Sequence, residues 1–190
     1  FSELKLNDVS LGDAFLSLQS QAQKEAYSLA FRIEEDGVDV VSATGNIGIE
    51  NRIPFWNIDA GFVDYNLSAL AGLTNIVFDP FDGKANGNLQ LNSTDGNITS
   101  SGVLNVDAFR LGVPYLNTNY SFNSMVPFVF TKDKISIQSI PFQDTGNHTG
   151  ILNGELTHQS FSDWGLDMQI DADNLEVLNT DFSENALYYG

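Results

Sequence analysis

Tyr27-Ser28-Leu29-Ala30-Phe31-Arg32-Ile33-Glu34 is the stretch of sequence that decides the fold. Large apolar side chains alternate along it with small, polar or charged ones, which is the pattern of a β-strand with one buried face. Asp36-Gly37 then gives a turn signal, and Val38-Asp39-Val40 resumes the alternation. An Asp-Gly pair between two alternating runs predicts a tight hairpin.

The same alternation recurs along the rest of the chain. Further runs are Trp56 to Ala60, Leu89 to Ile98 around Asp95-Gly96, Leu104 to Ala108, Phe128 to Ile137 across the turn 131–134, and Leu166 to Ala172. Parallel strands need crossovers of a dozen residues or more, so these short connections predict antiparallel neighbours. We predict an all-β fold built as an antiparallel meander, with one face of each sheet buried and the other in water.

Two segments depart from this alternation. The apolar positions that have helical spacing in the first segment are Leu11, Phe15, Leu18 and Ala22. Ser10 precedes them at the position of a helix cap. A shorter helix is predicted over residues 68–77 and is ended by Asp79-Pro80, because a residue before proline disfavours the helical conformation. One or two short helices are therefore expected beside the sheet.

Composition excludes some classes of function. Apolar residues make up 42% of the 190 residues, which favours a folded chain, and the net charge is −17 from 8 basic and 25 acidic residues. A protein that neutralises phosphates needs many Lys and Arg side chains, so nucleic-acid binding is excluded, and adsorption to anionic lipid headgroups is disfavoured. Contact with lipid acyl chains depends on apolar area and is compatible with this charge.

The chain is expected to form a single β-rich module, 1–190, because no linker or fixed-period repeat divides it. It has no cysteine, so its stability must come from its core and not from disulfides. No apolar run reaches the length of a membrane-spanning helix, and the first residues do not resemble a signal peptide. This part of the protein is expected to be soluble, either alone or as a fragment of a longer chain.

No catalytic constellation stands out, so no enzyme activity, cofactor or metal is predicted. His148 lies in a turn and is expected to be exposed, and His158 lies on a predicted strand. Nucleophile elbows and glycine-rich phosphate loops are absent from the sequence. The acidic stretches 79–82 and 171–174 concentrate oxygen ligands that suit calcium, but turn-forming Asp and Asn explain them more simply.

Glycine-led steps in the second half of the chain carry a resemblance. Gly83-Lys84-Ala85-Asn86-Gly87-Asn88-Leu89-Gln90-Leu91 is followed by Gly102-Val103-Leu104-Asn105-Val106. The series continues through residues 113–120, 154–161, 164–174 and 175–180, then Phe182 and 185–190. Its order and spacing resemble the carboxy-terminal region of the TamB family, the AsmA-like translocation and assembly module proteins, in its Bacteroidetes-type form. The resemblance covers residues 58–190 and is weak over 1–57.

This resemblance implies a curved open sheet, the β-taco or half-pipe, whose apolar concave face shelters phospholipid acyl chains between the inner and outer membranes. It implies a periplasmic, cell-envelope location for a parent chain that is anchored in the inner membrane. It also implies a role in outer-membrane assembly with TamA or another BamA-like barrel as partner. The family has no catalytic residues to transfer.

The groove-lining candidates are the apolar residues of the alternating runs: Trp56, Ile58, Leu104, Val106, Ile135, Ile137, Leu166, Met168 and Ile170. Alternation separates a dry face from a wet one, but it fits a filled core as well as a lined groove. The alternative is therefore a closed β-sandwich that binds carbohydrate or protein at a cell surface. Tyr115, Tyr120 and Trp164 are the aromatic residues expected to be exposed for that role.

Overall fold

The computed structural model describes residues 4–6, 9–22, 25–70 and 78–180, and it is an antiparallel all-β meander of twelve strands in one sheet. The strands are β1 (Leu4–Leu6), β2 (Val9–Ser20), β3 (Ala26–Glu35), β4 (Val38–Glu50), β5 (Ile53–Asn66), β6 (Phe81–Thr94), β7 (Asn97–Val113), β8 (Thr118–Ser121), β9 (Val126–Lys132), β10 (Lys134–Asp144), β11 (Thr149–Gln159) and β12 (Ser162–Ala172). Two 3-10 helices, η1 (Leu67–Leu70) and η2 (Pro114–Leu116), interrupt the series.

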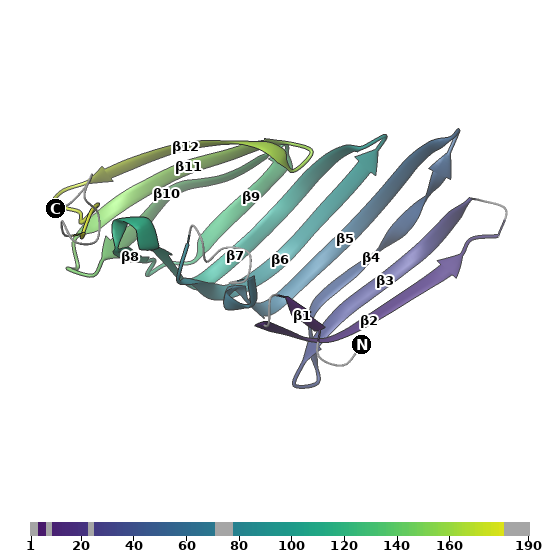
Figure 1. The fold of residues 1–190 in the computed structure, drawn as a ribbon, viewed down its shortest axis with the longest axis horizontal. Coiled ribbons are helices and arrows are strands. Elements are labelled where there is room, and N and C mark those ends of the chain that lie inside the picture. The colour runs from purple at the N-terminus through teal and green to yellow at the C-terminus, as the bar shows by residue number, and fades with distance from the viewer. Residues whose placement is uncertain (1–3, 7–8, 23–24, 71–77, 181–190) are drawn as a thin grey trace.

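Each strand pairs with its neighbour in the chain from β1 to β8 (Figure 1). The short strands β8 and β9 both lie between the longer β7 and β10. β9 pairs with Ser100 to Val106 of β7, and β8 pairs with Arg110 to Val113 near the other end of that strand. β11 and β12 then complete the sheet, so β1 and β12 are its two edges among the described residues. The predicted meander is confirmed.

The first predicted helix is wrong. Residues Leu11, Phe15 and Leu18 belong to strand β2, which pairs with β3 over eight consecutive residues from Asp13 to Ser20. Pairing satisfies the backbone of β3 and lets Leu16 and Leu18 extend the apolar face of the sheet, which a helix would leave unpaired.

The second predicted helix is only partly described. The 3-10 helix η1 covers the beginning of the predicted range 68–77, and residues 71–77 lie outside the described part of the chain. Part of the glycine-led series, Phe182 and 185–190, lies outside it as well.

Register gives the sheet one apolar face, which we call the inner face. One row of paired residues crosses ten strands and contains only apolar residues and glycine. Its members, in order, are Leu16, Phe31, Ala43, Ala60, Leu89, Gly102, Phe130, Ile135, Leu156 and Leu166. The opposite, outer face carries polar rows, of which one is Gln19, Ser28, Asn46, Asn57, Asn92 and Thr99. The alternation of the sequence is thus kept in register from edge to edge.

Three β-bulges shift the alternation without losing the apolar face. Two residues intervene between consecutive inner-face residues at Phe62 and Tyr65, at Val106 and Phe109, and at Ile137 and Ile140. One residue in each interval has a positive φ near 50°, namely Asp64, Ala108 and Ser139. A bulge adds one residue to one strand and bends it, so the apolar pattern resumes three positions later instead of two.

Asparagine side chains on neighbouring strands stabilise two of these bulges. The Asp64 N–H donates to Asn86 Oδ1 at 2.9 Å, and the Ser139 N–H donates to Asn153 Oδ1 at 2.8 Å. The Asn86 amide also donates to Asp64 Oδ1 at 2.9 Å. The backbone groups that a bulge removes from the ladder thereby keep hydrogen-bond partners.

Beyond the bulges, the inner face is covered by an aromatic cluster. Phe109 contacts Phe81, Phe122 and Phe128 with ring centroids 5.0–5.6 Å apart, and Phe122 stacks on Phe142. The cluster joins the buried residues Val106, Val126 and Ile140 and the short η1 segment into one core. This end of the sheet buries its apolar residues with no second sheet above it in the described part of the chain.

Two glycines of the family-like motif stand where no side chain fits. Gly87 and Gly102 have φ of +143° and +136°, and a Cβ on either would overlap a carbonyl oxygen of the neighbouring strand. Each lies opposite a leucine on the inner face, Gly87 opposite Leu104 and Gly102 opposite Leu89. At these two positions the motif has a backbone cause, which is the close approach of the paired strands β6 and β7.

We expect Phe109→Ala to lower the free energy of unfolding by about 3–5 kcal/mol, because Phe109 is buried and contacts three other rings. Phe15→Ala is the matched control, since Phe15 is half-exposed on the outer face, where its ring contacts the Arg32 guanidinium. The control should cost less than about 1 kcal/mol. Urea unfolding measures both, and equal losses would contradict the aromatic core.

We expect Gly87→Ala to destabilise the fold by about 1–3 kcal/mol, because a side chain at that φ is strained and meets the Val103 carbonyl oxygen. Gly154→Ala changes another inner-face glycine, whose nearest neighbour is the flexible Ile137 side chain at 3.3 Å. This control should cost distinctly less. Thermal unfolding of the two variants distinguishes backbone strain at Gly87 from the effect of replacing any glycine on the inner face. Equal losses of stability would contradict strain at Gly87.

Candidate functional site

The inner face is the candidate site, and all nine groove-lining candidates lie on it by register. They do not form one pocket. Leu166 shares a row with Ile135, and Met168 shares the next row with Ile137 through Gly154, whereas Trp56 and Ile58 lie several strands away on β5. The candidates therefore mark a surface that runs across the strands.

Exposure differs strongly along this surface. Val106, in the middle of the sheet and beside the aromatic cluster, is 2% exposed, whereas Leu166 on the edge strand β12 is 67% exposed. Trp56, Ile58, Leu104, Ile135 and Ile137 are partly buried, and Met168 and Ile170 are exposed like Leu166. At the other edge, Leu16 and Leu18 of β2 are also more than half exposed.

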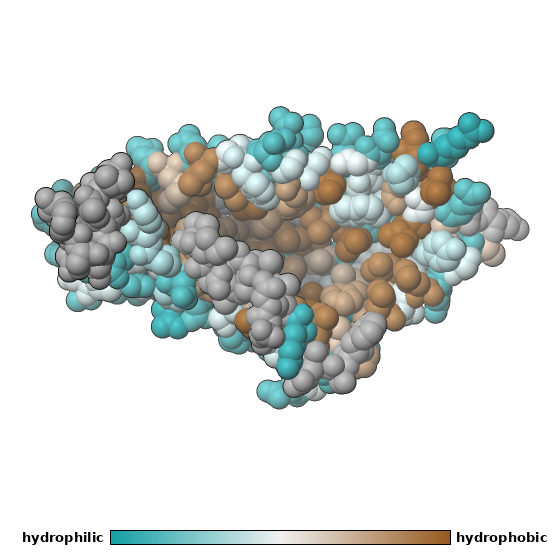
Figure 2. All heavy atoms as spheres, viewed as in Figure 1, coloured by the Kyte–Doolittle hydropathy of each residue, from teal (hydrophilic) through white to brown (hydrophobic). Residues whose placement is uncertain are grey.

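Figure 2 shows hydrophobic residues gathered on the face turned to the viewer, where the surface is hollowed between hydrophilic rims. The hollow lies over the middle strands seen in Figure 1. The accessible surface of the chain is 11799 Å², compared with roughly 8,900 Å² for a compact monomer of the same mass. Apolar side chains left uncovered near the edges contribute to this excess.

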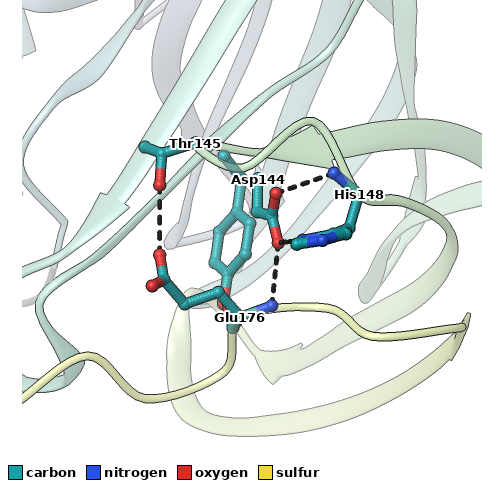
Figure 3. Close-up of polar contacts among 5 residues, drawn as sticks. Asp144, Thr145, His148 and Glu176 are labelled. Carbon is teal, nitrogen blue, oxygen red and sulfur yellow. Dashed lines mark hydrogen bonds and ion pairs between the residues drawn. The ribbon is translucent and has the colours of Figure 1, made fainter.

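A buried carboxylate anchors the segment that follows β12. Asp144 ends β10 with its side chain 1% exposed, and its Oδ2 accepts the Glu176 N–H at 2.8 Å and contacts His148 Nδ1 at 2.9 Å (Figure 3). Its Oδ1 accepts the His148 N–H, and Thr145 Oγ1 donates to Glu176 Oε2. Glu176, which follows β12, is thereby fixed against the end of β10.

Neighbouring contacts continue this attachment. The Tyr120 hydroxyl donates to the Glu176 carbonyl at 2.9 Å, Asn117 Nδ2 donates to the Asn179 carbonyl at 2.7 Å, and Leu175 packs on the core. We call residues 175–180 the strap. It lies beside η2, β8 and β10 and covers the same end of the sheet as the aromatic cluster.

The pKa of Asp144 is lowered to about 2. Burial acts to raise this pKa, but the hydrogen bonds from the Glu176 N–H, the His148 ring and the His148 N–H outweigh burial, and the His148 charge acts in the same direction. Tyr65 in the core shows the opposite behaviour, because burial and then the Glu35 charge raise its pKa. Asp144 is thus charged, and Tyr65 neutral, at neutral pH.

No three His, Asp or Glu side chains within the described ranges gather as metal ligands. The acidic stretch 79–82 contributes Asp82 to an ion pair with Arg110, and Asp82 also accepts the Gly83 N–H. A shallow hollow of about 370 Å³ on this side is lined by both members of that ion pair.

The two histidines occupy different environments. His148 lies in the turn after β10 with an exposed ring, as predicted. His158 lies on β11 and is buried, stacked on Phe161 with ring centroids 4.3 Å apart and in edge contact with Trp164. Its Nδ1 accepts the Phe161 N–H, so it orders the turn into β12.

One of the aromatic residues expected to be exposed is not. Tyr115 and Trp164 are largely exposed, but the Tyr120 ring packs in edge contact with Phe142 and its hydroxyl is bonded to the strap. Tyr120 is therefore part of the covered end of the sheet. Long-range pairing of β8 with β10 brings it there, which no local pattern indicates.

Several inner-face residues were not among the candidates. They are Leu16, Phe31, Phe62, Leu89, Leu91, Phe128, Phe130, Leu152 and Leu156. Alternation in their own strands is the signal that identifies them. For Phe109 the signal is the spacing of three residues from Val106, which marks a bulge. Phe122 and Phe142 follow Tyr120 and Ile140 by two residues, as in a strand.

No family model, curated protein or solved structure matches this chain. Among the described residues, no helix has the length and apolar character needed to cross a bilayer.

We expect Asp144→Asn to lower the free energy of unfolding at pH 7. The folded-state pKa is depressed, so the carboxylate stabilises the fold above its ordinary pKa, and this contribution is lost as pH falls from about 4 to about 2. The difference between wild type and variant should therefore shrink over that window. Urea unfolding across the pH range measures it, with Asp107→Asn on the exposed outer face as the control. A difference that is constant with pH would contradict a charged anchor.

Proposed function

We propose that the inner face of this sheet shelters lipid acyl chains, as a non-enzymatic segment of a TamB-like protein of the cell envelope. The observation that carries the proposal is the row of apolar residues and glycine that crosses ten strands without a polar interruption. A filled core needs apolar residues only where something covers them. Here the row runs from β2, where β1 does not cover it, to the edge strand β12, and its end members Leu16 and Leu166 are exposed.

The chemistry of the face suits a flexible hydrocarbon chain. Its side chains are aliphatic or aromatic, with glycines at intervals. Aliphatic side chains and phenyl rings form no hydrogen bonds with a ligand, so an acyl chain that lacks polar groups leaves none of them unsatisfied. Each methylene removed from water contributes about 0.8 kcal/mol, so a chain lying along several strands gains enough to remain bound. A ligand with many polar groups has few partners on this face.

The resemblance to the TamB family supplies the biological setting of the proposal. In that setting the segment contributes to phospholipid transport from the inner to the outer membrane and supports outer-membrane assembly. The parent chain is anchored in the inner membrane, this segment lies in the periplasm, and TamA or another BamA-like barrel is the partner. Two of the glycines that carry the resemblance, Gly87 and Gly102, have the backbone role described above.

The alternative, a closed β-sandwich binding carbohydrate or protein, has less support. A sandwich buries apolar residues between two packed sheets, whereas the described strands belong to one sheet. Of the three aromatic residues that favour it, Tyr120 is engaged in the covered end. Tyr115 and Trp164 lie on η2 and β12, far apart in the strand order.

Photo-crosslinking tests the proposal residue by residue. A photoreactive amino acid at Ile137 or at Met168 should capture phospholipid when the chain is expressed within its parent protein in the envelope, because both lie on the inner face. The matched controls are Val103 and Ile151, which are exposed apolar residues on the outer face. Mass spectrometry of the adducts reads the result. Equal capture at the outer-face positions, or none at Ile137 and Met168, would overturn lipid binding by the inner face.

A further inference from the structure

The outer edge of β12 is the longest stretch of sheet edge that has no partner among the described residues. β12 spans Ser162–Ala172 and pairs with β11 along its length, and no described strand pairs with its other side. Figure 1 shows it as the outermost strand beside β11. By contrast, β1 covers part of β2 at the opposite edge. A long edge without proline offers a row of backbone donors and acceptors to another strand.

The side chains of β12 divide cleanly between the two faces. Leu166, Met168 and Ile170 lie on the inner face and are 67%, 46% and 47% exposed, because no described strand lies next to the unpaired edge of β12. Asp167 and Asp171 lie on the outer face and are exposed. Neither aspartate forms an ion pair with any described residue.

The position opposite Asp167 increases the local negative charge. Asp167 pairs across the ladder with Glu155, whose carboxylate already binds Lys134 at 2.9 Å. The unpaired edge of β12 therefore carries two carboxylates on the outer face, Asp167 and Asp171, with Gln169 between them. The inner face of the same strand is apolar. Directly opposed charges of opposite sign stabilise a strand pair, and like charges destabilise it.

We propose that the outer edge of β12 binds, by strand addition, an extended protein segment in which apolar residues alternate with Lys or Arg. The basic side chains of the partner face Asp167 and Asp171, and its apolar side chains continue the strip formed by Leu166, Met168 and Ile170. The main-chain hydrogen bonds supply the affinity, and the alternation of charge and apolar residues supplies the specificity.

A second copy of this chain fits the edge poorly. Antiparallel pairing of two β12 strands centred on Asp167 places that residue opposite itself and Asp163 opposite Asp171, so like charges meet at these positions. The net charge of −17 on each copy adds a general repulsion. The proposal concerns the backbone edge and the outer-face charges, so it does not depend on lipid binding by the inner face.

Three synthetic peptides of about nine residues test the proposal against the full chain by fluorescence anisotropy. The first alternates lysine with valine, the second alternates glutamate with valine, and the third has the composition of the first with its lysines and valines in separate blocks. We expect the alternating lysine peptide to bind about tenfold more tightly than either of the others, which is the order of magnitude that two charged cross-strand pairs supply. Equal binding of the two lysine peptides would show charge attraction alone and overturn strand addition.

Charge reversal provides the second arm. Asp167→Lys combined with Asp171→Lys should invert the preference, so that the glutamate peptide binds more tightly than the lysine peptide. The matched control, Asp59→Lys with Asp107→Lys, makes the same change of net charge on exposed outer-face positions of β5 and β7 and should leave the preference unchanged. If the control inverts it too, or if neither does, the proposal fails.

Two further readouts complete the design. Circular dichroism of each variant verifies that the sheet is intact, and the peptide series on the unaltered chain stands as a test even if a variant unfolds. Light scattering of the chain alone at about 50 µM should give a monomer. A dimer that Asp167→Asn with Asp171→Asn strengthens, by removing the like-charge pairs, would assign the edge to a second copy and overturn the proposal.

Discussion

A single sheet with one apolar face must find something to cover that face, and the rest of the structure depends on how this is done. No second sheet is present among the described residues. The sheet itself therefore supplies the cover at one end, through the bulges on β5, β7 and β10, the aromatic cluster and the strap. Each bulge lies just before residues of its strand that enter the core. Bending and burial are thus parts of one solution.

The sequence predicts most strands correctly because alternation is local. It fails at β2, where Leu11, Phe15 and Leu18 match helical spacing while Ala14, Leu16 and Leu18 match strand spacing. Phe15 completes the helical pattern, yet it is an apolar residue on the outer face, placed beneath the Arg32 guanidinium at 4.2 Å. Pairing with β3 decides between the two patterns, and that pairing is a property of the whole sheet.

The candidate site is predictable in part for the same reason. Alternation assigns Val106 and Leu166 to the same face, and register confirms that assignment. It cannot tell that one is buried and the other exposed, because their environments are set by position in the strand order and by the aromatic cluster. The anchor at Asp144 is invisible in the sequence, since it joins β10 to a segment 32 residues further along the chain. The bulges are the opposite case, because a spacing of three between apolar residues, as in Phe62 and Tyr65, is a local signal that the sequence itself carries.

Charge and apolar surface have complementary roles in this protein. An exposed apolar strip on a neutral protein promotes association of copies, because two such strips bury one another. Here the outer face, the turns and the β12 edge carry the acidic residues, and the net charge of −17 opposes the approach of a second copy. A flexible uncharged hydrocarbon chain experiences no such repulsion and can still bury the strip. In the proposed function, the acidity that disfavours nucleic acids and anionic surfaces also helps to keep the inner face accessible to lipid acyl chains.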